Sequence, residues 1–176
     1  VTYAGFQRQY ASTSFWHAAA GGTSYMWRSF TAQSTVHAGC WVRYPTDAVA
    51  EYYQWIAFYN TNGQLVTVLQ CNPNGVLQVY NGQAVETYSG YNVTLGKGCW
   101  HHLCLSTAIG AVYGAVTAFL DFRPIITVTS KNTGASNIST IVLGNFTASE
   151  VNGRGQLQSG LVVSAVAAGN TLYHRF

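Results

Sequence analysis

The chain has 176 residues and a net charge of +3, with 48% hydrophobic, 14% aromatic and only 7% charged residues. This composition suits one domain with a sizeable core, and it excludes a disordered chain, which would be rich in charge and poor in aromatic residues. The basic residues are scattered singly and no run reaches about 18 apolar residues, so we expect neither a nucleic-acid partner nor membrane insertion.

Short alternating or apolar runs, separated by turn residues roughly every eight to twelve positions, dominate the chain and predict an all-β fold. Turns are well marked at residues 60–63 and 72–75, where asparagine and glycine accept positive φ. Pro124 is expected to break the run that begins at residue 115. In chain order we expect strands at residues 36–44, 52–59, 65–71, 76–80, 100–107, 115–122, 125–129, 140–143 and 161–166.

The first 34 residues show no clear pattern. We expect residues 1–34 to form an arm or an edge strand beside a β-sandwich that spans residues 35–176, in a single domain overall. Aromatic residues are frequent in this first part, and exposed aromatic side chains often anchor subunit interfaces. The candidate interface residues are Phe6, Tyr10, Phe15, Trp16, Tyr25 and Trp27.

From about residue 35 onward, the order of motifs resembles the laminin-G-like branch of the concanavalin A-like lectin and glucanase superfamily. Gly-Cys-Trp-His-His at 98–102 is the most specific similarity, and Gly-Cys-Trp-Val-Arg at 39–43 is similar to an early strand of that family. Weaker similarities lie at 74–77, 118–122, 140–145 and 160–166. The resemblance implies a two-sheet antiparallel jelly-roll sandwich that binds glycans or proteins. Phe122 and Ser164 depart from it, because they stand where the family has glycine and an acidic residue.

Acidic residues are too few and too dispersed for glycosidic cleavage, which normally needs two carboxylates about 5 to 10 Å apart. Glucanases of the resembled superfamily carry an acidic cluster on one strand, and this chain has none. Asp47 and Glu51 are the only close pair, and we expect them in a solvated connection. The chain also lacks the Gly-x-Ser-x-Gly motif of a serine nucleophile. We therefore expect no catalytic residues and no enzyme activity.

Neighbouring histidines on a strand point to opposite faces, so we expect one of His101 and His102 to be half-buried and hydrogen-bonded, and the other to lie on the sheet surface. Calcium is the commonest ion in the resembled family, but Asp121 is the only acidic residue at a family-like position. We expect Asp121 to cap a turn, and we expect no metal or other cofactor. The four cysteines are Cys40, Cys71, Cys99 and Cys104. Free thiols are favoured for them, and disulfides remain the alternative.

Three functions compete. The favoured one is a non-catalytic structural or adhesive module on a virion surface or in an extracellular location, such as a phage capsid-decoration or tail subunit. It would bind protein subunits as a homo-oligomer, with a surface glycan as a further candidate partner. The second is a secreted lectin, and the third and weakest is a glycoside hydrolase. The candidate ligand-binding residues, placed in two loops, are Asn72, Asn74, Tyr88, Tyr91 and Asn92.

Overall fold

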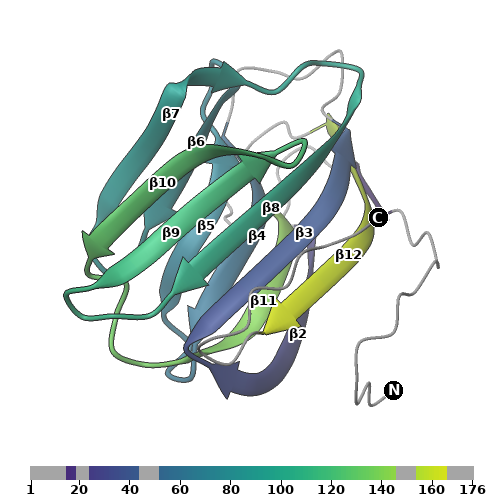
Figure 1. The fold of residues 1–176 in the computed structure, drawn as a ribbon. Helices are drawn as coiled ribbons and strands as arrows, with labels where there is room; N and C mark the ends of the chain where they lie inside the picture. Colours follow the sequence, from purple (N-terminus) through teal and green to yellow (C-terminus); the bar gives the residue numbers. More distant parts are fainter. Residues whose placement is uncertain (1–14, 19–23, 44–51, 146–153, 166–176) are drawn as a thin grey trace.

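The computed structural model describes residues 15–18, 24–43, 52–145 and 154–165, and these residues form twelve β-strands and no helix (Figure 1). The expected all-β class is confirmed. The described part of the chain accordingly has no helix long and apolar enough to cross a membrane. The strands are β1 (Phe15–Ala18), β2 (Ser24–Gln33), β3 (Thr35–Arg43), β4 (Tyr53–Asn60), β5 (Leu65–Cys71), β6 (Val76–Asn81), β7 (Glu86–Thr94), β8 (Trp100–Ala108), β9 (Gly114–Leu120), β10 (Arg123–Lys131), β11 (Ile138–Asn145) and β12 (Arg154–Ala165).

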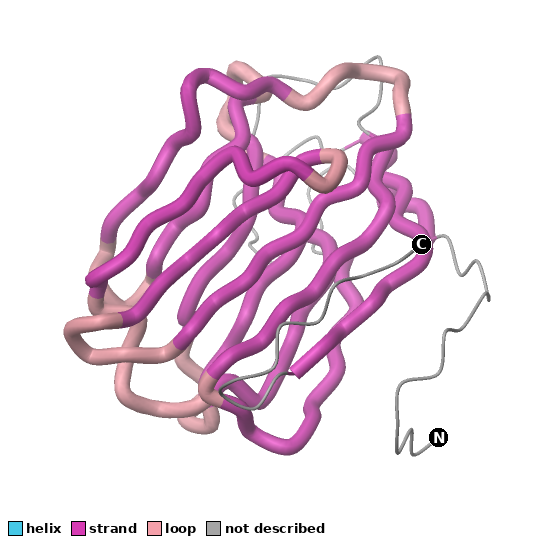
Figure 2. The backbone as a smooth tube through the Cα atoms, in the orientation of Figure 1, coloured by secondary structure: helices cyan, strands magenta, loops and turns pink. Residues whose placement is uncertain are grey.

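The strands form two antiparallel sheets of six strands each, packed face to face (Figure 2). Sheet A has the order β1-β12-β3-β8-β9-β10, and sheet B has the order β2-β11-β4-β5-β6-β7. Strands β3 and β8 are neighbours in sheet A although four strands of sheet B lie between them in the sequence. This crossing of the chain between the layers is the jelly-roll arrangement, so the expected two-sheet sandwich is also confirmed.

Strand β7 was not expected from the sequence pattern, and β1 and β2 lie in residues 1–34, for which an edge strand was one alternative. Strands β1 and β2 lie at the outer edges of sheets A and B, and β7 forms the opposite edge of sheet B. The prediction that residues 88–92 form a loop is therefore wrong, because β7 continues through them while it pairs with β6. The region looked irregular because it carries a bulge, which separates the pairs Val76–Thr94 and Gln78–Ser89.

The break expected at Pro124 lies elsewhere. The chain reverses at Asp121 and Phe122, both of which have positive φ, and Pro124 lies inside β10. Strand β10 is the edge of sheet A, and an edge strand tolerates proline because one row of its N–H groups has no partner strand.

The core lies between the sheets and follows from strict alternation in the central strands. On β3, four side chains point inward and are at most 1% exposed: Val36, Ala38, Cys40 and Val42. On β8, Leu103 and Leu105 lie opposite them and are fully buried. Sheet B contributes larger side chains to the same core, among them Trp55, Phe58 and Leu69.

One polar contact links the sheets through this core. Thr67 of β5 and Thr107 of β8 are both fully buried, and their hydroxyl oxygens lie 2.8 Å apart. A buried hydroxyl needs a partner, so each threonine satisfies the other across the apolar interior.

We expect Thr67→Val to lower the free energy of unfolding by about 1–3 kcal/mol, because it leaves the Thr107 hydroxyl buried without this partner. The double variant Thr67→Val/Thr107→Val should be less destabilised than the single one, since no polar group is then stranded. Urea unfolding of the two single variants and the double variant measures the coupling. Additive losses would show that the two hydroxyls do not depend on each other.

Candidate functional site

The predicted ligand-binding residues lie in different places. Asn72 and Asn74 lie in the β5–β6 turn, where the Asn72 Oδ1 atom accepts hydrogen bonds from the backbone N–H groups of Asn74 at 2.9 Å and Val76 at 3.0 Å. Asn72 therefore shapes the turn. Tyr91 and Asn92 lie on β7, and their side chains are outside the described part of the structure.

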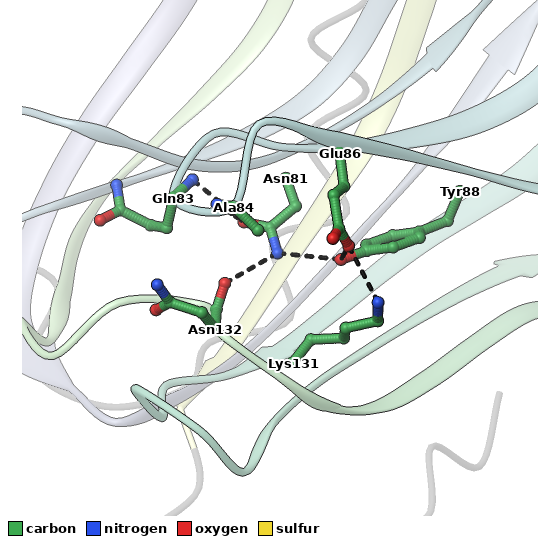
Figure 3. A network of polar contacts seen from close by, with 7 residues as sticks. All are labelled: Asn81, Gln83, Ala84, Glu86, Tyr88, Lys131 and Asn132. Atoms are coloured by element: carbon green, nitrogen blue, oxygen red, sulfur yellow. Dashed lines mark hydrogen bonds and ion pairs between the residues drawn. The ribbon is translucent and has the colours of Figure 1, made fainter.

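Tyr88 lies on β7 and pairs with Val79, near the end of β6 that is farther from the 72–75 turn. It belongs to a polar network between β7 and β10 (Figure 3). Its hydroxyl donates to Glu86 Oε2 at 2.8 Å and accepts from Asn81 Nδ2 at 3.2 Å. The Lys131 ammonium lies 3.0 Å from the same Glu86 oxygen. The hydrogen bond from Tyr88 and the contact with Lys131 hold the pKa of Glu86 below its usual value. The network ties an edge of sheet B to an edge of sheet A, so it does not join Tyr88 to the 72–75 turn in one site.

The predicted interface residues also separate. Phe6 and Tyr10 lie outside the described residues, as do the side chains of Phe15 and Trp16 on β1. Tyr25 and Trp27 lie on β2, with 47% and 65% of their surface exposed. On sequence grounds these two belonged to a segment expected as an arm or an edge strand, and β2 is an edge strand that seven residue pairs join to β11 within sheet B.

Trp27 begins a row of side chains that crosses the outer face of sheet B. The register places it beside Val142 of β11, which is followed by Ala57 of β4, Val68 of β5 and Tyr80 of β6. The three small residues form an apolar cluster separate from the main core, and Tyr80 packs against it. Trp27 and Tyr80 are four strand spacings apart, which is about 19 Å at a spacing of about 4.8 Å.

Two polar rows flank this apolar row. On one side, the register aligns Gln54, Gln70, Gln78 and Ser89 across β4 to β7, and Gln78 Nε2 donates to Ser89 Oγ at 3.1 Å. On the other side, the Ser29 and Thr140 hydroxyl oxygens lie 3.0 Å apart, and Tyr59 is paired with Thr140. We call these three rows, together with Tyr25, the sheet-B face.

The sheet-B face has no acidic or basic residue in its three rows. Its titratable groups are tyrosines, and burial, with a smaller effect of the nearby Tyr25, raises the pKa of Tyr59 above its usual value. Tyr59 therefore stays a neutral phenol at neutral pH. Aromatic rings, amides and hydroxyl groups surround a buried centre, in which Ala57, Val68 and Val142 are at most 7% exposed. The face could not be recognised from the sequence, because β4 looks apolar throughout and β2 was not separated from the rest of residues 1–34.

The other candidate residues lie at one end of sheet A. The carboxylate of Asp121 bridges the two histidines: Oδ2 lies 2.9 Å from His101 Nδ1, and Oδ1 accepts from the His102 backbone N–H at 2.8 Å. These hydrogen bonds outweigh the opposing effect of desolvation, which is the largest single contribution, so the pKa of Asp121 falls below 3.8. His101 is 18% exposed and hydrogen-bonded, as expected of one of the pair. His102 lies on the outer side of the sheet but is only 6% exposed, so the expectation that it lies on the surface is wrong.

Among the described side chains, no three of the His, Cys, Asp and Glu residues are grouped closely enough to hold a metal ion. The four cysteines are free thiols. Burial raises the pKa of the Cys71 thiol to about 12, against a smaller lowering by the Trp55 indole N–H, which lies 3.3 Å from the sulfur. Burial likewise raises the pKa of Cys104 to about 11.

No protein-family model and no curated protein matches the sequence. Solved structures match the fold. An endo-β-1,4-glucuronan lyase from the fungus Trichoderma reesei is 12% identical, with a TM-score of 0.62, and the match covers 91% of this chain and 90% of the lyase. A tetrameric galectin from the ball sponge Cinachyrella sp. is 12% identical, with a TM-score of 0.53, and covers 80% of this chain and 99% of its own.

A sialidase also matches, at 11% identity and a TM-score of 0.62 over 80% of this chain, but the chain spans only 14% of the sialidase. Together these matches show that the chain has the concanavalin A-like jelly-roll fold, as the sequence resemblance implied. By name, these three matching structures are a lyase, a galectin and a sialidase. Nothing in the comparisons supports a structural role in a virion.

The prediction that the protein is not an enzyme needs correction. The matching structures are mostly enzymes, and alginate lyases are prominent among them beside the glucuronan lyase. The prediction was derived mainly from the absence of a cluster of acidic residues. Such a cluster is a requirement of glycosidic hydrolysis and not of every reaction on a polysaccharide. Enzymes that share the fold include lyases, so a shortage of paired carboxylates does not exclude catalysis.

We expect Asp121→Asn to lower the urea midpoint of unfolding at neutral pH, because asparagine tolerates the turn geometry but loses the ionic hydrogen bonds to both histidines. Since the folded pKa of Asp121 is lowered, its stabilisation is present above the unfolded pKa of about 3.8 and is lost as pH falls through the folded value. The difference between the two proteins should therefore shrink below that pH. A difference independent of pH would contradict the assigned role.

Proposed function

We propose that the protein binds a carbohydrate chain on the sheet-B face. The observation that carries this proposal is the row from Trp27 to Tyr80, in which two aromatic side chains flank the small residues Val142, Ala57 and Val68. Aromatic rings offer flat apolar surfaces on which the C–H faces of sugar rings stack, while Tyr and Trp keep a polar group available for hydrogen bonding.

The flanking rows supply the other half of sugar recognition. Gln70 and Gln78 are partly exposed and present amides, each with two donors and an acceptor, and sugar hydroxyl groups need partners of both kinds. The span of about 19 Å between Trp27 and Tyr80 exceeds the size of one sugar ring, which favours a chain of several sugars over a monosaccharide. The names of the compared proteins, a galectin and lyases of glucuronan and alginate, support a carbohydrate ligand.

We expect Trp27→Ala to weaken binding of a polysaccharide ligand by at least about tenfold, through loss of one stacking platform. The ligand would first be identified on a glycan array, and affinities would then be measured by isothermal titration calorimetry. Because Trp27 is 65% exposed, the variant should keep the wild-type unfolding midpoint. Tyr113→Ala, which removes an aromatic ring that is 84% exposed in the β8–β9 connection, is the matched control and should bind normally. Unchanged affinity in Trp27→Ala would refute the proposal.

A second candidate function is polysaccharide lyase activity on the same face, favoured by the chemistry of Tyr59. A lyase needs a group that moves a proton beside the scissile bond, and tyrosine can act as a general acid or base. Tyr59 is half-buried and its raised pKa keeps it protonated, as a proton donor to a departing sugar oxygen requires. The lyases among the compared structures support this candidate.

We expect Tyr59→Phe to abolish turnover of a polysaccharide substrate while leaving its affinity within about threefold, because only the hydroxyl is removed. Ultraviolet absorbance of the unsaturated sugar product reports turnover, with uronate polysaccharides as the first substrates. Tyr113→Phe is the matched control. Full activity in Tyr59→Phe would exclude Tyr59 as the proton donor, and absence of product with the wild type on every bound glycan would leave binding as the function.

Self-association and an extracellular location stay predictions from the sequence. Light scattering of the wild type and of Trp27→Ala tests the first of them, because Trp27 is the most exposed described member of the predicted interface set.

A further inference from the structure

The turn between β9 and β10 carries an unusual backbone. Asp121 has φ of 48° and Phe122 has φ of 67°, so both occupy the left-handed region. Two-residue hairpin turns of this kind favour asparagine and glycine, and a bulky aromatic residue there is strained. Strain of this sort persists only where the surrounding structure enforces it, and it concentrates at functional sites.

The hydrogen bonds of Asp121 hold the turn in this conformation. Its backbone N–H donates to the His102 carbonyl at 2.8 Å, and its carboxylate binds the His102 backbone N–H and the His101 ring. These three contacts hold the turn over the start of β8.

The strained turn places the Phe122 ring on the outer face of sheet A. The ring stacks on His102, with centroids 4.5 Å apart and planes at 19°, and meets Trp41 edge-on at 6.2 Å. Phe122 nevertheless stays 50% exposed, whereas His102 beneath it is 6% exposed. The conformation therefore presents an aromatic ring to solvent rather than burying it, which core packing alone does not explain.

Other exposed groups adjoin this ring on the same face. Trp41 is 37% exposed and Trp100 is 45% exposed. Arg43 lies directly opposite Trp100 in the β3–β8 register and two residues along β3 from Trp41, and its Nε–H donates to the Gly98 carbonyl at 3.2 Å. We call Trp41, Arg43, Trp100 and Phe122 the sheet-A patch.

We propose that the sheet-A patch is a second binding site, and that its ligand is an acidic sugar such as a hexuronate unit of a polysaccharide. The exposed ring of Phe122 stacks on the sugar ring beside the two tryptophans, and the guanidinium of Arg43 binds the carboxylate through charge-assisted hydrogen bonds. The charge at this end of sheet A fits an anion: Arg43, Lys97 and Arg123 are cationic and exposed, and the one nearby described carboxylate, Asp121, is engaged with the histidines. The site is separate from the sheet-B face, because the two lie on opposite outer surfaces of the sandwich.

The test titrates the full chain carrying Trp27→Ala, so that binding on the sheet-B face is weakened first. The probes are an oligomer of β-1,4-linked glucuronate and the matched neutral oligomer of β-1,4-linked glucose. Adding Phe122→Asn keeps a residue that accepts positive φ but removes the ring, and adding Arg43→Gln removes the charge. Tyr113→Ala in the same background is the control.

We expect the Trp27→Ala protein to bind the glucuronate oligomer more tightly than the glucose oligomer. Arg43→Gln should cut the affinity for glucuronate about tenfold or more and remove the preference, and Phe122→Asn should weaken both oligomers. No glucuronate binding by Trp27→Ala, or equal affinity in Arg43→Gln and its parent, overturns the proposal. If Phe122→Asn fails to fold, Trp100→Ala replaces it. Neither outcome bears on the proposed site on the sheet-B face, because that site is tested by the affinity that Trp27→Ala loses relative to the wild type.

Discussion

The register between β3 and β8 is the constraint on which the rest of the structure depends. Nine residue pairs, from Thr35–Ala108 to Arg43–Trp100, follow one another without a bulge. Because side chains alternate along a strand, this uninterrupted pairing puts one set of residues into the core and the other on the outer surface. A slip of β3 by one residue would turn Trp41 into the core and Val42 towards solvent. The bulges lie elsewhere, chiefly in sheet B and at the edges.

The two outer surfaces have different chemistry as a result. Sheet B presents neutral amides, hydroxyl groups and aromatic rings across six strands, and its bulge near Gln54 keeps both Trp55 and Ile56 in the core while Ala57 points outward. Sheet A concentrates its exposed aromatic rings at one end, beside arginine. The same fold therefore supports two kinds of contact, and the sandwich itself dictates neither, because function depends on the side chains that a fold carries.

Much of the fold could be predicted from alternation and turn residues, and the site could not. Strands such as β5 and β6 were bounded closely, because their runs end in Asn and Gly and their periodicity is plain. Strand β2 could not be bounded because Tyr25, Trp27 and Arg28 give no apolar alternation, although Phe30 of the same strand packs against the core. Lyase activity was not considered as a function because catalysis on a polysaccharide was equated with paired carboxylates. The sheet-B face joins residues from six strands, and only the register brings them together.

The four thiols differ sharply in accessibility, and that difference is of practical value. Cys40 and Cys71 are buried with raised pKa values, Cys104 is mostly buried, and Cys99 is exposed just before β8. Since thiolates rather than thiols react with electrophiles, maleimide or iodoacetamide reagents should modify Cys99 first. A fluorophore attached there would sit one residue from Trp100, close enough for the indole to quench it. The wild-type chain thus carries its own attachment point for an optical reporter of ligand arrival, with no cysteine to be engineered in or out.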